Sequence, residues 1–181
     1  MTAPLFIALL AIAVALVYLA IAIRTWANVH GTRVVVCPGT QSPAAVTIDA
    51  GHAMASAVWE HADLRVTSCS RWPDGQGCDQ PCVGQIEDAP SDTLPRTIAA
   101  RFFVAQRCAI CAKPIEPPAS FALQPGFMQP GTRRVDTWDD VPPQDLPRAV
   151  AEWRPLCANC TLSESFRQTF PDRVTNRERR E

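Results

Sequence analysis

The chain opens with one long apolar segment and then changes to short segments of mixed character. Residues 5–23, LFIALLAIAVALVYLAIAI, run for nineteen positions without a charged side chain. At a rise of about 1.5 Å per residue, a helix of this length reaches about 28 Å, close to the hydrocarbon thickness of a bilayer. The pattern therefore predicts a single transmembrane helix over 5–23, which would contact the lipid bilayer, after a short N-terminus at 1–4.

Two other interpretations of this segment remain open. The small residues at 20–22, AIA, are typical of a signal-peptide cleavage site, although MTAP at the N-terminus lacks the basic residues of such a leader. A buried helix of this length would need a larger surrounding domain than the rest of the chain supplies. Arg24 and Arg33 follow the segment and no basic residue precedes it, which predicts an N-terminus outside and the remainder in the cytoplasm.

Residues 24–95 alternate between strand and helix signals. RVVVCPGTQSPAAVTID, residues 33–49, predicts two strands around a turn. Residues 50–61 predict a helix, residues 64–69 a strand, and a further helix opens near Cys82.

Residues 96–172 form a second segment with similar signals. Residues 133–138 predict a strand, and residues 145–153 a short helix capped by Asp145, with Leu146, Val150 and Trp153 facing inward. After Cys160, the apolar residues at 162, 166 and 170 recur every four positions, which predicts a helix with one apolar face. Residues 173–181 predict a charged tail without stable structure. The fold class expected is α+β.

Composition excludes several classes of function. The formal net charge is −1, so a nucleic-acid partner is not expected. We find no Ser-His-Asp set, no glycine-rich phosphate loop and no carboxylate-rich metal motif, so we do not expect an enzyme.

Four of the eight cysteines form two Cys-x-x-Cys pairs. Cys108 and Cys111 are separated by forty-five residues from Cys157 and Cys160. A disulfide within such a pair closes too short a loop to constrain the unfolded chain, whereas two pairs together supply the four thiolates of a tetrahedral Zn²⁺ site. Zinc is the expected occupant, and disulfides between the pairs or a redox pair remain the alternatives.

The other four cysteines are spaced less regularly. Two of them end predicted strands and two lie near the start of a predicted helix, so a second four-cysteine zinc site is expected at Cys37, Cys69, Cys78 and Cys82. An iron–sulfur cluster uses the same ligands and is the alternative there, although the spacing matches none of the familiar runs. Buried free thiols or disulfides are the remaining alternatives.

Two stretches carry a resemblance to a known zinc fold. CAICAKPI, residues 108–115, looks like a metal-binding turn, and LCANCTLSESFRQTF, residues 156–170, puts two ligands at the head of a helix. The arrangement resembles the treble-clef zinc finger. Treble clefs of the His-Asn-His nuclease kind require a histidine base between the pairs. This chain has no histidine after His61, and Thr161 stands where that motif would place one, so nuclease activity is not expected.

The whole chain also resembles a group of bacterial single-span membrane proteins to which no activity is assigned. The resemblance rests on the N-terminal span and on VVVCP, SCSRWP, CDQPCVGQIE, CAICAKPI and WRPLCANC. It implies a location in the bacterial inner membrane. Members of that group often carry Cys-x-x-Cys-His at the last motif, and Thr161 departs from it, which argues against covalent haem.

We therefore expect a membrane-anchored zinc-binding protein that presents a cytoplasmic surface to a protein partner. A protein in which the thiols handle metal or undergo oxidation is the alternative.

Overall fold

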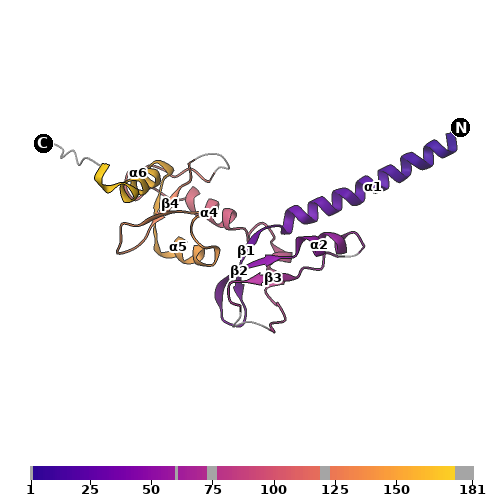
Figure 1. The fold of residues 1–181 in the computed structure, drawn as a ribbon, viewed down its shortest axis with the longest axis horizontal. Coiled ribbons are helices and arrows are strands. Elements are labelled where there is room, and N and C mark those ends of the chain that lie inside the picture. The colour runs from indigo at the N-terminus through magenta and orange to yellow at the C-terminus, as the bar shows by residue number, and fades with distance from the viewer. Residues whose placement is uncertain (1, 60, 73–76, 119–122, 174–181) are drawn as a thin grey trace. The chain divides into compact units, whose positions relative to one another are not determined.

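The computed structural model describes residues 2–59, 61–72, 77–118 and 123–173. The chain divides into two compact units, unit 1 from Met1 to Leu94 and unit 2 from Pro95 to Glu181. Each unit combines helices with a small three-stranded antiparallel sheet, so the fold class is α+β as predicted (Figure 1). Most of the tail predicted at 173–181 lies outside the described residues.

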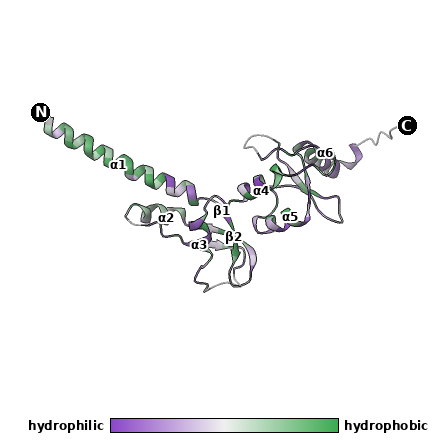
Figure 2. Ribbon diagram, turned by 180° about the vertical axis from the view of Figure 1, so that it is seen from behind, coloured by the Kyte–Doolittle hydropathy of each residue, from purple (hydrophilic) through white to green (hydrophobic). Residues whose placement is uncertain are grey.

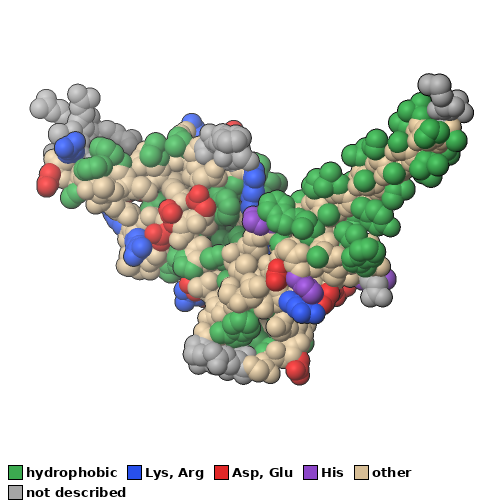
Figure 3. All heavy atoms as spheres, turned by 45° about the vertical axis from the view of Figure 1, so that its right-hand side comes forward, with side chains coloured by type: hydrophobic (Ala, Val, Ile, Leu, Met, Phe, Trp, Pro, Cys, Tyr) green, Lys and Arg blue, Asp and Glu red, His purple; other side chains and the backbone are tan. Residues whose placement is uncertain are grey.

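The first element is the long helix α1, Thr2–Val29. It is long and apolar enough to cross a membrane, a property that a signal sequence or the core helix of a soluble protein can share. None of the residues in its most apolar stretch is buried within the structure. Figure 2 shows apolar residues along most of the helix, and in Figure 3 their side chains cover its exposed surface.

Unit 1 is built on the sheet β1–β2–β3, formed by Thr32–Cys37, Ser42–Ile48 and Val66–Cys69. The first two strands form the predicted hairpin, in which Cys37 pairs with Ser42. Along β2 every second residue is buried, namely Ala44, Val46 and Ile48, because alternate side chains of a strand point to the same face. That face forms the core of the unit.

Two helices complete unit 1. Helix α2, Ala50–Ala57, begins where Asp49 accepts a hydrogen bond from the backbone N–H of His52. It is shorter than the sequence predicts, since the Ser56 hydroxyl accepts the backbone N–H of Asp63 and turns the chain back. Helix α3, Val83–Asp88, begins after Cys82, as predicted.

The end of α1 is fastened to this sheet by Arg33. The residue is 1% exposed, and its guanidinium donates to the carbonyl oxygens of Asn28 in the last turn of α1, of His30 just after the helix, and of Pro90. The cation therefore caps the helix C-terminus, where free carbonyls and the helix dipole favour positive charge. Burial lowers the pKa of Arg33.

Unit 2 surrounds a second sheet, ordered β5–β4–β6, with strands Val135–Thr137, Gly126–Met128 and Arg154–Leu156. Its helices are α4, Pro95–Val104, α5, Leu146–Glu152, and α6, Ala158–Thr169, with short 3₁₀ turns at Pro143–Asp145 and Pro171–Arg173. The core lies between α4, α5 and the central strand β4. There the rings of Phe127 and Phe103 contact each other in a tilted arrangement, with centroids 5.0 Å apart, and both residues are fully buried.

The structure corrects three details of unit 2. Helix α4 and strands β4 and β6 were not predicted. Asp145 precedes α5, but its side chain does not cap the helix. Its carboxylate instead accepts a hydrogen bond from the guanidinium of Arg148 at 3.0 Å. The three residues predicted to face inward do so, with Leu146 buried and Val150 and Trp153 half-buried against the core, but Trp153 lies just beyond the end of α5.

Candidate metal centre

The first pair of cysteines lies on a tight turn after α4. The backbone N–H of Cys108 donates to the carbonyl of Lys113 at 2.9 Å, and that of Ala112 donates back to Cys108 at 2.9 Å. Ala112 adopts φ 59°, the left-handed conformation that lets the chain reverse. The reversal brings the sulfur atoms of Cys108 and Cys111 to one side of the turn.

The second pair is placed by β6 and α6. Strand β6 pairs with β4 and ends directly before Cys157, which takes the N-cap position of α6. The backbone N–H of Ala109 donates to the carbonyl of Pro155 on β6 at 2.9 Å, so the turn of the first pair is fastened to the strand that carries the second. The helix then presents Cys160 one turn further on.

A close contact between α6 and the sheet fixes the depth of this helix. Thr161 is 1% exposed, and its hydroxyl and backbone N–H both donate to the carbonyl of Cys157. Its side chain lies directly over Gly126 of β4, where a Cβ atom would stand 2.8 Å from Cγ2 of the threonine. Gly126 is therefore required for the first turn of α6 to approach the sheet.

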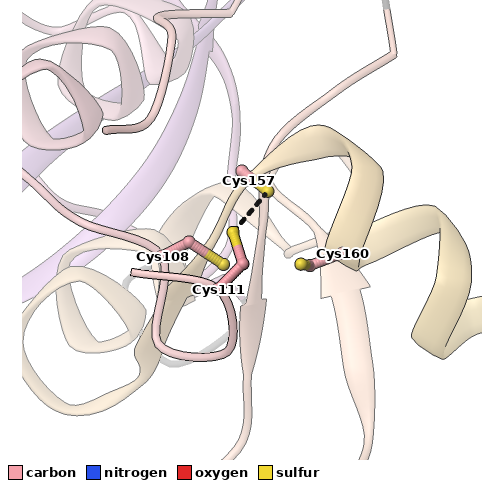
Figure 4. A group of neighbouring side chains, drawn as sticks. All are labelled: Cys108, Cys111, Cys157 and Cys160. Carbon is pink, nitrogen blue, oxygen red and sulfur yellow. Dashed lines mark hydrogen bonds between the residues drawn. The ribbon is translucent and has the colours of Figure 1, made fainter. Parts of the chain in front are cut away.

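The four sulfur atoms of Cys108, Cys111, Cys157 and Cys160 all lie within 4.8 Å of one another, and their side chains converge (Figure 4). The sulfur atoms of Cys111 and Cys157 are 3.7 Å apart. Four thiolates at about 2.3 Å from a tetrahedral Zn²⁺ stand about 3.8 Å from each other. A disulfide would need about 2.05 Å, and all eight cysteines are free thiols. The set could hold a metal ion.

The protonation of these thiols depends on their surroundings. Burial alone would raise the pKa of Cys108, but backbone N–H groups of Cys111, Cys157 and Ile110 donate to its sulfur and lower the pKa to about 6. Burial raises the pKa of Cys157 and that of Cys160, and at Cys160 the neighbouring thiols add to the rise. Without a cation the set thus keeps protons on Cys157 and Cys160, which a divalent ion would displace.

The other four cysteines gather in unit 1, but in a different manner. Cys37, Cys69, Cys78 and Cys82 all line one cavity of about 460 Å³. Within the part of the chain that the structure describes, only the unit 2 set brings three or more potential ligand atoms within 4.8 Å of one another. The four cysteines of unit 1 therefore line a common cavity, whereas the sulfur atoms of unit 2 converge closely enough to bind one ion.

Comparisons with protein-family models, with curated proteins and with solved structures gave no match to this chain.

The sequence showed the four cysteines of unit 2 but not the residues that bring them together. Gly126 and Thr161 lie thirty-five positions apart and share no motif. The β6 carbonyl of Pro155, which fastens the turn, belongs to a strand with no alternating pattern. The only sequence signal at these positions was the glycine itself, since an isolated glycine in a strand often marks a close backbone approach.

Proposed function

We propose that this chain is a membrane-anchored zinc-binding protein, in which a structural Zn²⁺ holds unit 2 together and the folded part presents a cytoplasmic surface to a protein partner. The observation that carries the proposal is the convergence of four sulfur atoms within 4.8 Å, from two segments far apart in the sequence.

The donor set supports zinc. Four thiolates in tetrahedral arrangement are typical of structural zinc and of iron–sulfur proteins, and the sulfur spacing in unit 2 suits a single ion. The order of elements also resembles a treble clef, with a ligand-bearing turn, the hairpin β4–β5, and a helix whose first turn supplies the second pair. Four protein ligands leave no coordination position for substrate or water, which favours a structural role over catalysis.

The apolar helix supports the anchor. None of the residues in the most apolar stretch of α1 is buried within the structure, whereas a core helix is mostly buried. A bilayer would cover them. The orientation with the N-terminus outside rests on Arg24 and Arg33, both located after the span.

A partner surface is suggested by the far side of α6. Leu162, Phe166 and Phe170 lie on one face of this helix, as their spacing predicts, yet they are 52%, 47% and 39% exposed. The rings of the two phenylalanines contact each other in a tilted arrangement, with centroids 5.0 Å apart.

One observation favours the alternative of thiol-based metal handling. Cys108 has a lowered pKa of about 6, and Cys111 beside it is exposed, a combination found at reactive thiols. Metal that leaves readily, with rapid alkylation of Cys111 at neutral pH, would support this alternative.

The test is elemental analysis of the full-length chain purified in detergent, together with a count of reactive thiols. We expect zinc that survives dialysis against a mild chelator and is lost in Cys157→Ser. The control is Ser163→Ala, an exposed position of α6 in which the cysteines are untouched. A wild-type protein without bound metal that still melts cooperatively would contradict a structural ion.

The membrane part is tested separately by fusing reporters to the C-terminus. Fluorescence of a cytoplasmic reporter and inactivity of a periplasmic phosphatase are expected, with the protein retained in membranes after alkaline washing. Cleavage near residue 22 and release of a soluble protein would identify α1 as a signal peptide and refute the anchor.

A further inference from the structure

Four cysteines line the cavity of unit 1, on one side of its sheet. Cys37 ends β1 and Cys69 ends β3, and their pairing with Ser42 and Val46 puts both on the same face of the sheet. The same face carries Val35, Ala44 and Val46, which form the apolar wall of the cavity together with Trp72.

Cys78 and Cys82 are held over this face by two glutamine side chains. Gln80 accepts the backbone N–H of Val66 on β3 at 2.7 Å. Gln85 pairs with both the N–H and the carbonyl of Val36 on β1, at 2.9 and 2.7 Å. The segment that carries Cys78 and Cys82 is therefore fastened to both outer strands, and all four cysteines line the same cavity.

Two of these sulfur atoms also accept hydrogen bonds from the backbone. The N–H of Gln80 donates to Sγ of Cys78 at 3.3 Å, and Gly39 and Thr40 donate to that of Cys37. Such bonds to sulfur are typical of metal-binding thiolates, where they orient the ligand and tune the metal.

The separation of the sulfur atoms selects the kind of occupant. A single tetrahedral Zn²⁺ needs sulfur atoms about 3.8 Å apart, a spacing that unit 2 approaches. In unit 1 no three of the four sulfur atoms lie within 4.8 Å of one another, and the four cysteines line a cavity of about 460 Å³. An iron–sulfur cluster places several iron and sulfide atoms between its thiolates, so its ligands stand farther apart than those of one ion.

We propose that unit 1 is an iron–sulfur protein module, in which Cys37, Cys69, Cys78 and Cys82 ligate one cluster inside this cavity. The apolar wall of Val35, Ala44, Val46 and Trp72 shields the cluster on the side of the sheet. This site is independent of the zinc site in unit 2, so the protein carries two different metal groups.

The experiment is metal and sulfide analysis of the full-length chain purified anaerobically in detergent, before and after reconstitution with ferrous iron and sulfide. We expect iron and acid-labile sulfide in equal amounts, together with about one equivalent of zinc, visible absorption from sulfur-to-iron charge transfer, and an electron paramagnetic resonance signal that changes on reduction with dithionite.

Variants assign the groups to their units. Cys69→Ser and Cys82→Ser should each lose the iron and sulfide and keep the zinc, while Cys160→Ser should lose the zinc and keep the iron. Ser68→Ala, beside Cys69 on β3, is the matched control and should keep both.

If a variant fails to fold, the wild-type protein still shows whether unit 1 binds an iron–sulfur cluster. Two equivalents of zinc and no iron, failure to take up iron and sulfide on anaerobic reconstitution, or recovery of the four unit 1 cysteines as disulfides would each overturn the cluster. The zinc in unit 2 is judged separately, by the loss of one equivalent of zinc in Cys160→Ser.

Discussion

Replacing Gly126 with alanine tests how the sheet of unit 2 positions the metal ligands. The new Cβ would press on the carbonyl oxygen of Asp136 in β5 and stand 2.8 and 3.1 Å from Cγ2 and Oγ1 of Thr161. Neither group can swing away, because the first is backbone in a paired strand and the second is buried and bonded to the carbonyl of Cys157. The strain is therefore passed to the turn that carries Cys157 and Cys160.

The magnitude follows from the packing of this contact. Overfilling a close-packed interior costs about 1–3 kcal/mol. Alanine recovers about 0.5–1 kcal/mol of this because glycine loses more backbone freedom on folding. A net loss of about 1–2 kcal/mol remains in the zinc-bound fold, whereas metal-free unit 2, which is unfolded without its ion, does not bear this cost. Zinc must restore the strained position, so its affinity should fall by a factor of about 5–30.

The assay is a competition titration of the full-length protein with a chromophoric chelator, alongside thermal unfolding of the zinc-loaded form. We expect weaker binding and a melting temperature lower by about 4–16 °C for Gly126→Ala. Gly84→Ala in α3 is the control, since an added Cβ there meets no atom within 4 Å. A Gly126→Ala protein with wild-type affinity and melting temperature would refute the positioning argument.

Three further outcomes are expected. Cys157→Ser should leave unit 2 unfolded at any zinc concentration that saturates the wild type, because structural zinc contributes on the order of 10 kcal/mol to folding. Circular dichroism and proteolysis check this, and a folded variant would contradict it. Zinc affinity should rise by at least about a hundredfold per pH unit near neutrality, because the raised pKa values of Cys157 and Cys160 leave at least two protons for zinc to displace. Titrations at several pH values measure the slope, and a flat profile would show that no proton is released. Phe127→Ala should lower the free energy of unfolding of unit 2 by about 3–5 kcal/mol, since the side chain is fully buried against Phe103. A loss below about 1 kcal/mol in denaturant titrations would show that Phe127 does not belong to the core.

The sequence indicated the elements that form from local signals. The hairpin around Cys37 has turn residues between two apolar runs, and α6 has an apolar residue at every fourth position, so both could be predicted. Strand β4 could not, because Gly126–Met128 is too short to show alternation and is a strand only through its pairing with β5 and β6. Helix α4 does carry a signal, with Pro95 at its start and buried Ala99 and Phe103 four positions apart, but its charged residues dilute the pattern.

The same limit applies to the candidate sites. Spacing alone grouped Cys108 and Cys111 with Cys157 and Cys160, because paired ligands on a turn and on a helix are a local pattern. Spacing could not show how far apart the unit 1 sulfur atoms stand, since that depends on the register of β1, β2 and β3 and on two glutamine side chains that fasten a distant segment. Periodicity also predicted an apolar face on α6 without indicating that Phe166 would remain exposed.

The bonds of Arg33 have a mechanical consequence for a protein anchored by α1. The helix continues to Val29, and β1 begins at Thr32 after two intervening residues. From β1, the guanidinium binds the carbonyl of Asn28 in the last helical turn and that of Pro90. These hydrogen bonds couple the end of α1 to the sheet of unit 1. A spanning helix changes its tilt in bilayers of different thickness. If α1 spans a bilayer, the sheet of unit 1 would reorient together with the helix.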